Sequence, residues 1–152
     1  MNIAEQIAKH FKEVHFGGNW TGSNMKDVLS GITFEQATKK VKDLNTILTL
    51  TYHIHYYVAE VLRVFEGEPL KAKDEFSFDH PEITSQAEWD AFVTKVFKAA
   101  EDFEEHLKKL PEDCFDQPFT DEKYGNYYRN MHGIIEHTHY HLGQISLLKK
   151  LV

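Results

Sequence analysis

Three histidines occur within five positions near the C-terminus, in the segment HTHYHLGQ at residues 137–144. Imidazole binds metal ions and exchanges protons near neutral pH, so this density indicates chemistry. His137 and His141 are four residues apart, a spacing at which two side chains on one helix face can reach the same ion. The zinc-protease pattern H-E-x-x-H would need glutamate at position 138, which is Thr138. The segment therefore predicts a metal site of another kind.

The position of each histidine on a helical wheel separates this cluster into two pairs. At 100° per residue, His137 and His141 fall at about 300° and 340° from Ile134, at the edge of the apolar sector. His132 and His139 fall on the far side, which they share with Glu136. We interpret this second group as a solvated polar face that would bind stray metal at most.

A third ligand is expected from another helix, because two ligands leave a metal site incomplete. The segment TLTYHIHYYVAEVL carries His53 at one edge of its apolar sector and His55 just beyond the other edge. The wheel favours His53 only slightly. A lone histidine at a core edge is about as often a hydrogen-bonded core residue as a ligand.

Two polar residues close to these histidines are candidates for supporting roles. Glu60 lies two turns beyond His53, too far for an obvious ligand, and is expected to contact a ligand or the substrate. Gln144 lies one turn beyond His141 and could orient it, or it could be an ordinary polar residue at a helix seam. Tyr56, Tyr57 and Tyr140 could donate protons, although tyrosines at helical spacing are more often core residues.

The elements that must position these residues are helical. Asparagine, threonine and serine caps precede amphipathic segments, including capping-box patterns at Thr33 and Ser85. Four helices are expected, at residues 2–14, 33–66, 85–110 and 126–152, the second of them with a restart near Asn45. We predict one domain spanning residues 1–152, an all-α antiparallel four-helix bundle in which the loop of residues 67–84 is long enough to cross over.

Composition narrows the function classes. The chain has 152 residues and a net charge of −7, and nothing concentrates lysine and arginine on one element, which argues against a nucleic-acid partner. No apolar run is long enough to span a membrane. The single cysteine, Cys114, has no partner for an internal disulfide, so a cytoplasmic location is expected. Gly133, Tyr140 and Leu147 recur at seven-residue steps and predict either a second internal seam or part of a homodimer face.

Three motifs together resemble the DinB/YfiT-like superfamily, over essentially the whole chain. They are HTHYHLGQI, the dipeptide HI after an apolar stretch, and the loop GGNWTGSN. The resemblance implies a four-helix bundle, commonly dimeric, with a divalent metal held by one histidine of the second helix and an H-x-x-x-H pair of the last. In this sequence those ligands would be His53, His137 and His141, and neither His55 nor His139.

The resemblance also implies a range of activities. Characterised members include transferases and isomerases that use a low-molecular-weight thiol, so a small-molecule substrate is expected. Imidazole ligands suit Zn or Ni best, with Mn or Fe possible. A hydrolase that uses metal-bound water and a non-catalytic metal-binding bundle stay open as alternatives, and haem is a weaker one. The resemblance places Asn19 and Trp20 near the metal; alternatively, Trp20 anchors its loop to the core.

Overall fold

The computed structural model describes residues 1–152 and is entirely helical, without β-strands. The predicted all-α fold class is confirmed. None of the helices is both long and apolar enough to cross a membrane. The helices are α1 (Ile3–Phe16), α2 (Met25–Leu29), α3 (Phe34–Thr38), α4 (Ile47–Phe65), η1 (Asp74–Phe76), α5 (Gln86–Lys108), η2 (Glu112–Asp116), η3 (Glu122–Tyr124) and α6 (Tyr127–Leu148).

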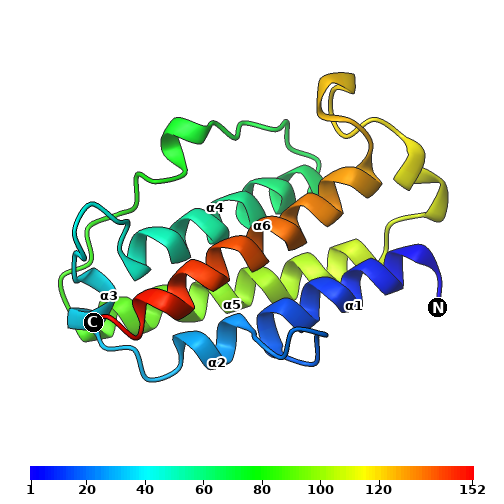
Figure 1. Ribbon diagram of the computed structural model, residues 1–152. Coiled ribbons are helices and arrows are strands. Elements are labelled where there is room, and N and C mark those ends of the chain that lie inside the picture. The colour runs from blue at the N-terminus through cyan, green and yellow to red at the C-terminus, as the bar shows by residue number, and fades with distance from the viewer.

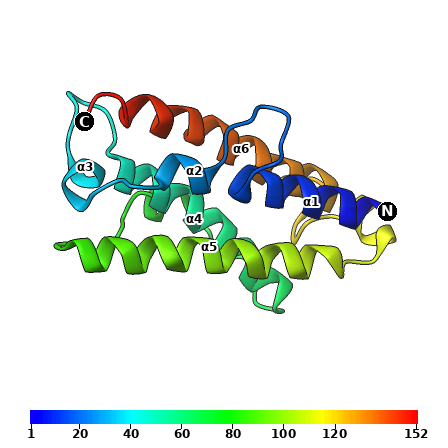
Figure 2. The same ribbon diagram turned by 90° about the horizontal axis from the view of Figure 1, so that it is seen from below.

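The four long helices α1, α4, α5 and α6 pack side by side (Figures 1 and 2). Helices α1 and α6 run in one direction, and α4 and α5 run in the other (Figure 1). Around the bundle, α1 packs against α5, α5 against α4, α4 against α6, and α6 against α1. Because α4 and α5 are parallel, residues 66–85 between them return along the length of the bundle, and we call this stretch the crossover segment.

Side-chain caps start the long helices at the positions that the sequence indicates. Asn2 forms a full capping box with Glu5 at the start of α1. Ser85 accepts a hydrogen bond from the backbone N–H of Glu88 at the start of α5. The capping box predicted there is only half formed, because the Glu88 carboxylate accepts from the backbone N–H of Thr84 at 2.6 Å.

The predicted helix over residues 33–66 is wrong as a single element. Helix α3 ends at Thr38, and α4 begins only at Ile47. Between them Lys42 has a φ of 48°, a left-handed conformation that breaks a helix. The restart expected near Asn45 occurs one residue later, where the Thr46 hydroxyl caps α4.

The core consists of two hydrophobic clusters, one toward each end of the bundle. Phe11, Phe103 and Met131 belong to the first, and Trp89 and Leu142 belong to the second. Along α4 and α6 the two clusters meet near the histidine-rich segments, since adjacent turns of each helix contribute to different clusters. The histidines therefore project from rigid, well-packed helix segments.

Candidate metal centre

Three histidines converge on the seam between α4 and α6. One side-chain nitrogen from each of His53, His137 and His141 lies within 4.8 Å of the others. His53 comes from α4, and the other two come from successive turns of α6. The ring centroids are 4.5 to 4.7 Å apart. We call these residues the inner triad.

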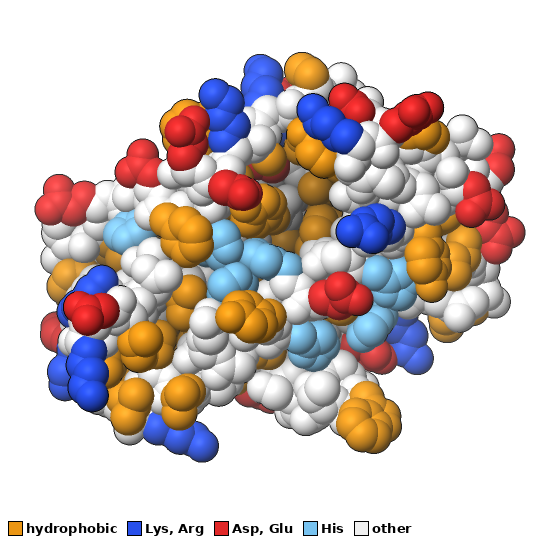
Figure 3. Space-filling model, turned by 45° about the horizontal axis from the view of Figure 1, so that its top comes forward, with side chains coloured by type: hydrophobic (Ala, Val, Ile, Leu, Met, Phe, Trp, Pro, Cys, Tyr) orange, Lys and Arg blue, Asp and Glu red, His pale blue; other side chains and the backbone are white.

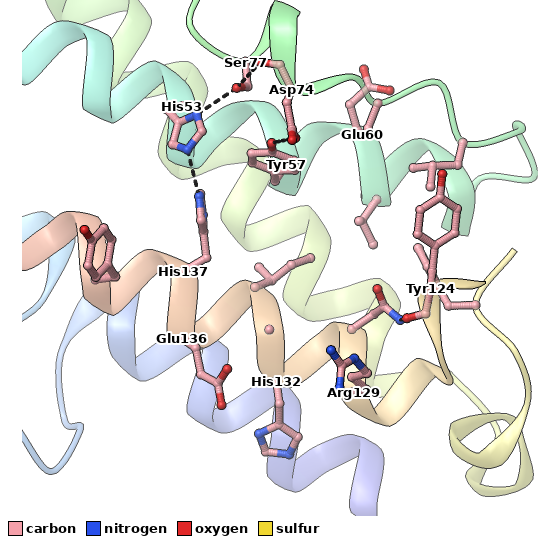
Figure 4. Close-up of a pocket in the computed structure, with 18 of the residues that line it drawn as sticks. His53, Tyr57, Glu60, Asp74, Ser77, Tyr124, Arg129, His132, Glu136 and His137 are labelled. Carbon is pink, nitrogen blue, oxygen red and sulfur yellow. Dashed lines mark hydrogen bonds between the residues drawn. The ribbon is translucent and has the colours of Figure 1, made fainter. Parts of the chain in front are cut away.

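A hydrogen-bond chain fixes the tautomer of His53 (Figure 4). The Ser77 hydroxyl donates to the backbone oxygen of Asp74 at 2.7 Å. Its proton is thereby used, so Ser77 Oγ accepts from His53 Nδ1–H, at 3.0 Å. Nε2 of His53 therefore carries the lone pair, as is needed for imidazole to bind a metal ion through that atom.

His141 is oriented in the same way from its own helix. Its Nδ1–H donates to Gln144 Oε1 at 2.7 Å, which leaves the Nε2 lone pair free. The sequence suggested Gln144 either as an orienting group for His141 or as an ordinary seam residue. This hydrogen bond is the contact that the orienting role requires.

The remaining triad member faces His53 directly. His137 Nε2 lies 2.9 Å from His53 Nε2. Since the His53 nitrogen carries the lone pair, His137 Nε2–H is the donor in this arrangement. An ion held by all three histidines would need the other tautomer of His137, with the proton on Nδ1.

Burial favours the uncharged form of two triad members, His53 and His137. Removal from water, followed by the neighbouring His141 and His53, lowers the pKa of His137 to about 4. Burial, followed by His141, also lowers the pKa of His53. Neutral imidazole is the metal-binding form, so the lowered pKa values of His53 and His137 favour binding of a cation.

The crossover segment covers the triad from above. The Phe78 ring stacks on His53 with centroids 4.0 Å apart and planes 13° apart. The Tyr57 hydroxyl donates to the Asp74 carboxylate, and the Tyr57 ring packs edge-on against His137 at 5.0 Å. Burial and the bond to Asp74 raise the pKa of Tyr57 to about 12.

A cavity of about 1140 Å³ adjoins the triad, and all three histidines line it. It lies between α4, α6, the crossover segment and the segment that leads into α6 (Figures 3 and 4). Figure 3 shows the hollow beside a group of histidines. Glu60 also lines the cavity, but its carboxylate pairs with Arg63 at 3.1 Å. An open cavity of this size can admit a small molecule to the triad.

A sequence model of the DinB superfamily matches residues 19–145, a range that contains the whole inner triad. The chain belongs to the DinB superfamily. No curated protein and no solved structure matches it. In this DinB superfamily member the donor set fits a divalent metal ion, because three imidazoles converge and two of them carry their lone pair on Nε2, toward the site.

A second group of histidines lies on the outer side of α6. His132 and His139, which the sequence placed together on that side, are joined by His10 of α1. The His10 ring centroid is 6.4 Å from that of His132 and 6.3 Å from that of His139. The inner triad is the one group of three potential ligands whose donor atoms come within 4.8 Å of one another. We call His10, His132 and His139 the outer trio.

His55 points away from the triad. It is buried, its ring lies 5.9 Å edge-on from Phe92 of α5, and its Nδ1 has no hydrogen-bond partner. Burial, followed by Lys95, lowers its pKa to about 4. The helical wheel favoured His53 over His55 only slightly. The structure distinguishes them, because the His53 ring faces α6 and the His55 ring faces α5.

The other suggested residues are less close to the triad. Tyr140 lines the cavity and packs edge-on against His141 at 4.9 Å. Tyr56 does not line it, and its hydroxyl instead accepts a hydrogen bond from the backbone N–H of Lys73 at 2.9 Å.

The loop between α1 and α2 does not contribute to this cavity. Asn19 is buried, and its amide donates to the backbone oxygens of Glu13 and Ser23 at 2.9 and 2.7 Å. Trp20 is fully exposed, at 100%, so it does not anchor the loop to the core either. Neither Asn19 nor Trp20 lines the cavity.

Sequence reasoning missed Ser77, Asp74 and Phe78, which contact His53 or Tyr57 directly. All three lie in the predicted loop of residues 67–84, where no periodicity indicates which side chains turn inward. The available signal was the length of that loop, which allowed it to pass back over α4.

Proposed function

We propose that this DinB superfamily member is a divalent-metal-dependent enzyme that transfers a group to or from a low-molecular-weight thiol. His53, His137 and His141 would be the metal ligands, with Zn or Ni favoured. The observation that carries the proposal is an inner triad that opens into a cavity. Catalytic metal sites keep a position open for substrate, whereas structural sites are closed by a fourth protein ligand.

The protein side chains would divide the work between orientation and binding. Ser77 and Gln144 hold His53 and His141 with Nε2 toward the site. A bound ion would supply a positive charge that favours the thiolate over the thiol. The Tyr57 hydroxyl, held by Asp74, faces the same cavity and is suited to orient a polar group of the substrate.

Hydrolysis through metal-bound water is the second candidate. The observation that favours it is the same open cavity, since water can reach the triad as readily as a thiol can. A purely structural role for the metal is less well supported, because no fourth histidine, cysteine or carboxylate joins the inner triad.

Metal content tests the ligand assignment. We expect the purified tag-free protein to contain close to one equivalent of metal, and His53→Ala and His141→Ala to lose it while the helical circular dichroism spectrum is kept. His55→Ala is the matched control for His53→Ala, because both residues lie on α4 two positions apart. Retention of full metal occupancy by His53→Ala, or its loss only with His55→Ala, would overturn the assignment.

The nature of the reaction is tested on the cobalt-substituted protein. Addition of mercaptoethanol is expected to produce a sulfur-to-cobalt charge-transfer band, which requires the thiol to occupy an open position. If no thiol produces the band, while phenyl acetate is hydrolysed in a metal-dependent way, the hydrolase would replace the transferase as the proposed function.

We also propose that α6 contributes to a homodimer face. Tyr140 and Leu147 of α6, and Leu151 just beyond its C-terminal end, are more than half exposed, at 66%, 59% and 51%. Exposed apolar side chains that follow one helix are typical of protein contacts. Size-exclusion chromatography with light scattering should give a dimer mass for the native chain and a monomer mass for Leu147→Glu. A monomer mass for the native chain would contradict the dimer.

A further inference from the structure

The distribution of charge in the cavity is uneven. Three carboxylates line it, from Glu60, Asp74 and Glu136, and Asp74 lies beside the inner triad as part of the hydrogen-bond chain of His53. Arg129 is the one lysine or arginine in the lining. It lies near the start of α6, at the opposite end of the cavity from the triad (Figure 4).

The guanidinium group of Arg129 has no partner within the protein. The chain has two arginines, and Arg63 pairs with Glu60 at 3.1 Å. The Arg129 side chain is exposed and makes no ion pair and no hydrogen bond, while its backbone N–H donates to Asn126 Oδ1. Its planar set of N–H donors is therefore free to bind a carboxylate in bidentate fashion.

The local backbone makes room for this side chain. A Cβ atom at Gly125 would lie 2.8 Å from Arg129 Cδ, closer than such contacts allow. Gly125 also has a φ of 78°, which favours glycine. The exposed rings of Tyr124 and Tyr128 line the cavity close to Arg129 in the sequence. The arginine therefore occupies space that the turn before α6 leaves open.

The helix sets the distance between the arginine and the triad. Arg129 precedes His137 by eight residues, which at 1.5 Å per residue is about 12 Å along α6. The two positions differ by about 80° around the helix, so both can face one cavity. A ligand that reaches from the triad to Arg129 must accordingly be elongated.

We propose that Arg129 is the anion-binding residue of this cavity and selects elongated thiols that carry a carboxylate at the end opposite the sulfur. This proposal rests on the thiol-dependent function proposed above and adds the class of thiol. Asp74 disfavours a second anion near the triad, whereas Arg129 offers the only lysine or arginine charge in the lining. The cavity thus has a direction, with sulfur at the triad end and carboxylate at the start of α6.

The test compares matched pairs of thiols on the cobalt-substituted protein. Mercaptooctanoate, which is long enough to span the cavity, is compared with mercaptooctanol, and mercaptopropionate with mercaptopropanol. The charge-transfer band reports binding of each thiol. We expect the acid to bind about tenfold more tightly than the alcohol at the octyl length, and no such preference at the propyl length.

Substitutions assign the preference to one residue. Arg129→Gln should abolish the preference for mercaptooctanoate, and Arg129→Lys should retain part of it. Arg63→Gln removes the same charge from the other arginine and should leave the preference unchanged. An equal affinity for acid and alcohol in the native protein would overturn the proposal, as would an equal loss of the preference in Arg63→Gln.

A second measurement works without metal and so separates this proposal from the proposed function. With only two arginines, the side-chain Nε–H region of a ¹⁵N spectrum should hold two signals. Millimolar octanoate should shift the Arg129 signal and not that of Arg63, and octanol should shift neither. That result supports the anion site even if no thiol produces the cobalt band. Failure of octanoate to shift the Arg129 signal would overturn the proposal even if thiols bind.

Discussion

The inner triad and the outer trio are built from the same side chain on the same helix, yet only the triad converges. Each takes two histidines from α6 and one from a neighbouring helix, α4 for the triad and α1 for the trio. His137 and His141 are one turn apart, whereas His132 and His139 are two turns apart. A separation of seven residues is about 10.5 Å along a helix, too far for both rings to reach one ion without a large change of rotamer. The number of histidines does not make a site; their spacing does.

The two groups also differ in what holds their rings. His53 and His141 each donate Nδ1–H to a fixed acceptor, Ser77 or Gln144. In the outer trio, burial and the neighbouring His10 lower the pKa of His132 and of His139, but no hydrogen bond fixes either ring. His10 itself is exposed. Orientation by a second set of groups turns neighbouring imidazoles into aligned ligands.

The largest expected effect comes from comparing His137→Ala with His139→Ala, two residues apart on α6. Removal of a triad ligand should weaken zinc binding at least about 100-fold, since two imidazoles remain of three. Removal of the trio member should change the affinity less than about twofold. Competition with a chromophoric zinc chelator measures both. Equal losses in the two variants would show that the distinction between the groups is wrong.

The next effect concerns the groups that orient the ligands. Ser77→Ala and Gln144→Ala should each weaken zinc binding by about 10- to 100-fold, the usual cost of removing a group that orients a histidine ligand. Ser77→Thr keeps the hydroxyl and should restore most of the affinity. Native affinity in Ser77→Ala would mean that packing against Phe78 is sufficient to orient His53.

His15 shows what burial does to a histidine that is not part of a converging group. His15 on α1 is buried and belongs to neither group, and its Nδ1 lies 2.9 Å from the backbone oxygen of Phe11. Because a backbone oxygen can only accept, Nδ1–H is the donor. Burial lowers the pKa of His15 from 6.5 to about 4. Burial alone therefore gives a neutral imidazole without a metal site.

This lowered pKa predicts how stability depends on pH. In the unfolded chain His15 binds its proton more tightly than in the folded protein. The contribution of neutral His15 to stability is therefore complete above pH 6.5 and is lost as the pH falls toward 4. Between pH 7 and pH 5 the loss from His15 should be about 2 kcal/mol. In urea unfolding, the free energy of unfolding of His15→Leu should fall between pH 7 and pH 5 by that much less than the free energy of the native chain. The control His80→Gln should keep the native pH dependence. An unchanged dependence in His15→Leu would contradict the assignment.

The smallest expected effect is at the exposed edge of the outer trio. His10→Ala should change the free energy of unfolding by less than about 0.5 kcal/mol, as is usual for exposed positions without special contacts. The His10→Ala variant should also still bind one equivalent of metal tightly. Thermal unfolding and elemental analysis measure these two quantities. A loss of the tight equivalent in His10→Ala would make the outer trio the stronger site and reverse the comparison.

Local sequence patterns predicted much of the fold and part of the site. The caps at Asn2 and Ser85 marked where α1 and α5 begin, because capping uses residues adjacent in sequence. The break between α3 and α4 was underestimated, since a left-handed residue such as Lys42 carries no strong sequence signal. On α6 the wheel separated His137 and His141 from His139, because 3.6-residue periodicity fixes the direction of each side chain.

The sequence by itself determined which residues share a helix face, and therefore the H-x-x-x-H pair and its exclusion of His139. Family resemblance, and not periodicity, chose His53 over His55. Only the tertiary structure decided that Ser77 and Asp74 meet His53 and Tyr57, that His10 joins the outer trio, and that Arg129 shares a cavity with the triad. The reason is physical: helical periodicity is a local property of the backbone, whereas the path of a crossover segment and the pairing of helices depend on packing between residues far apart in the chain.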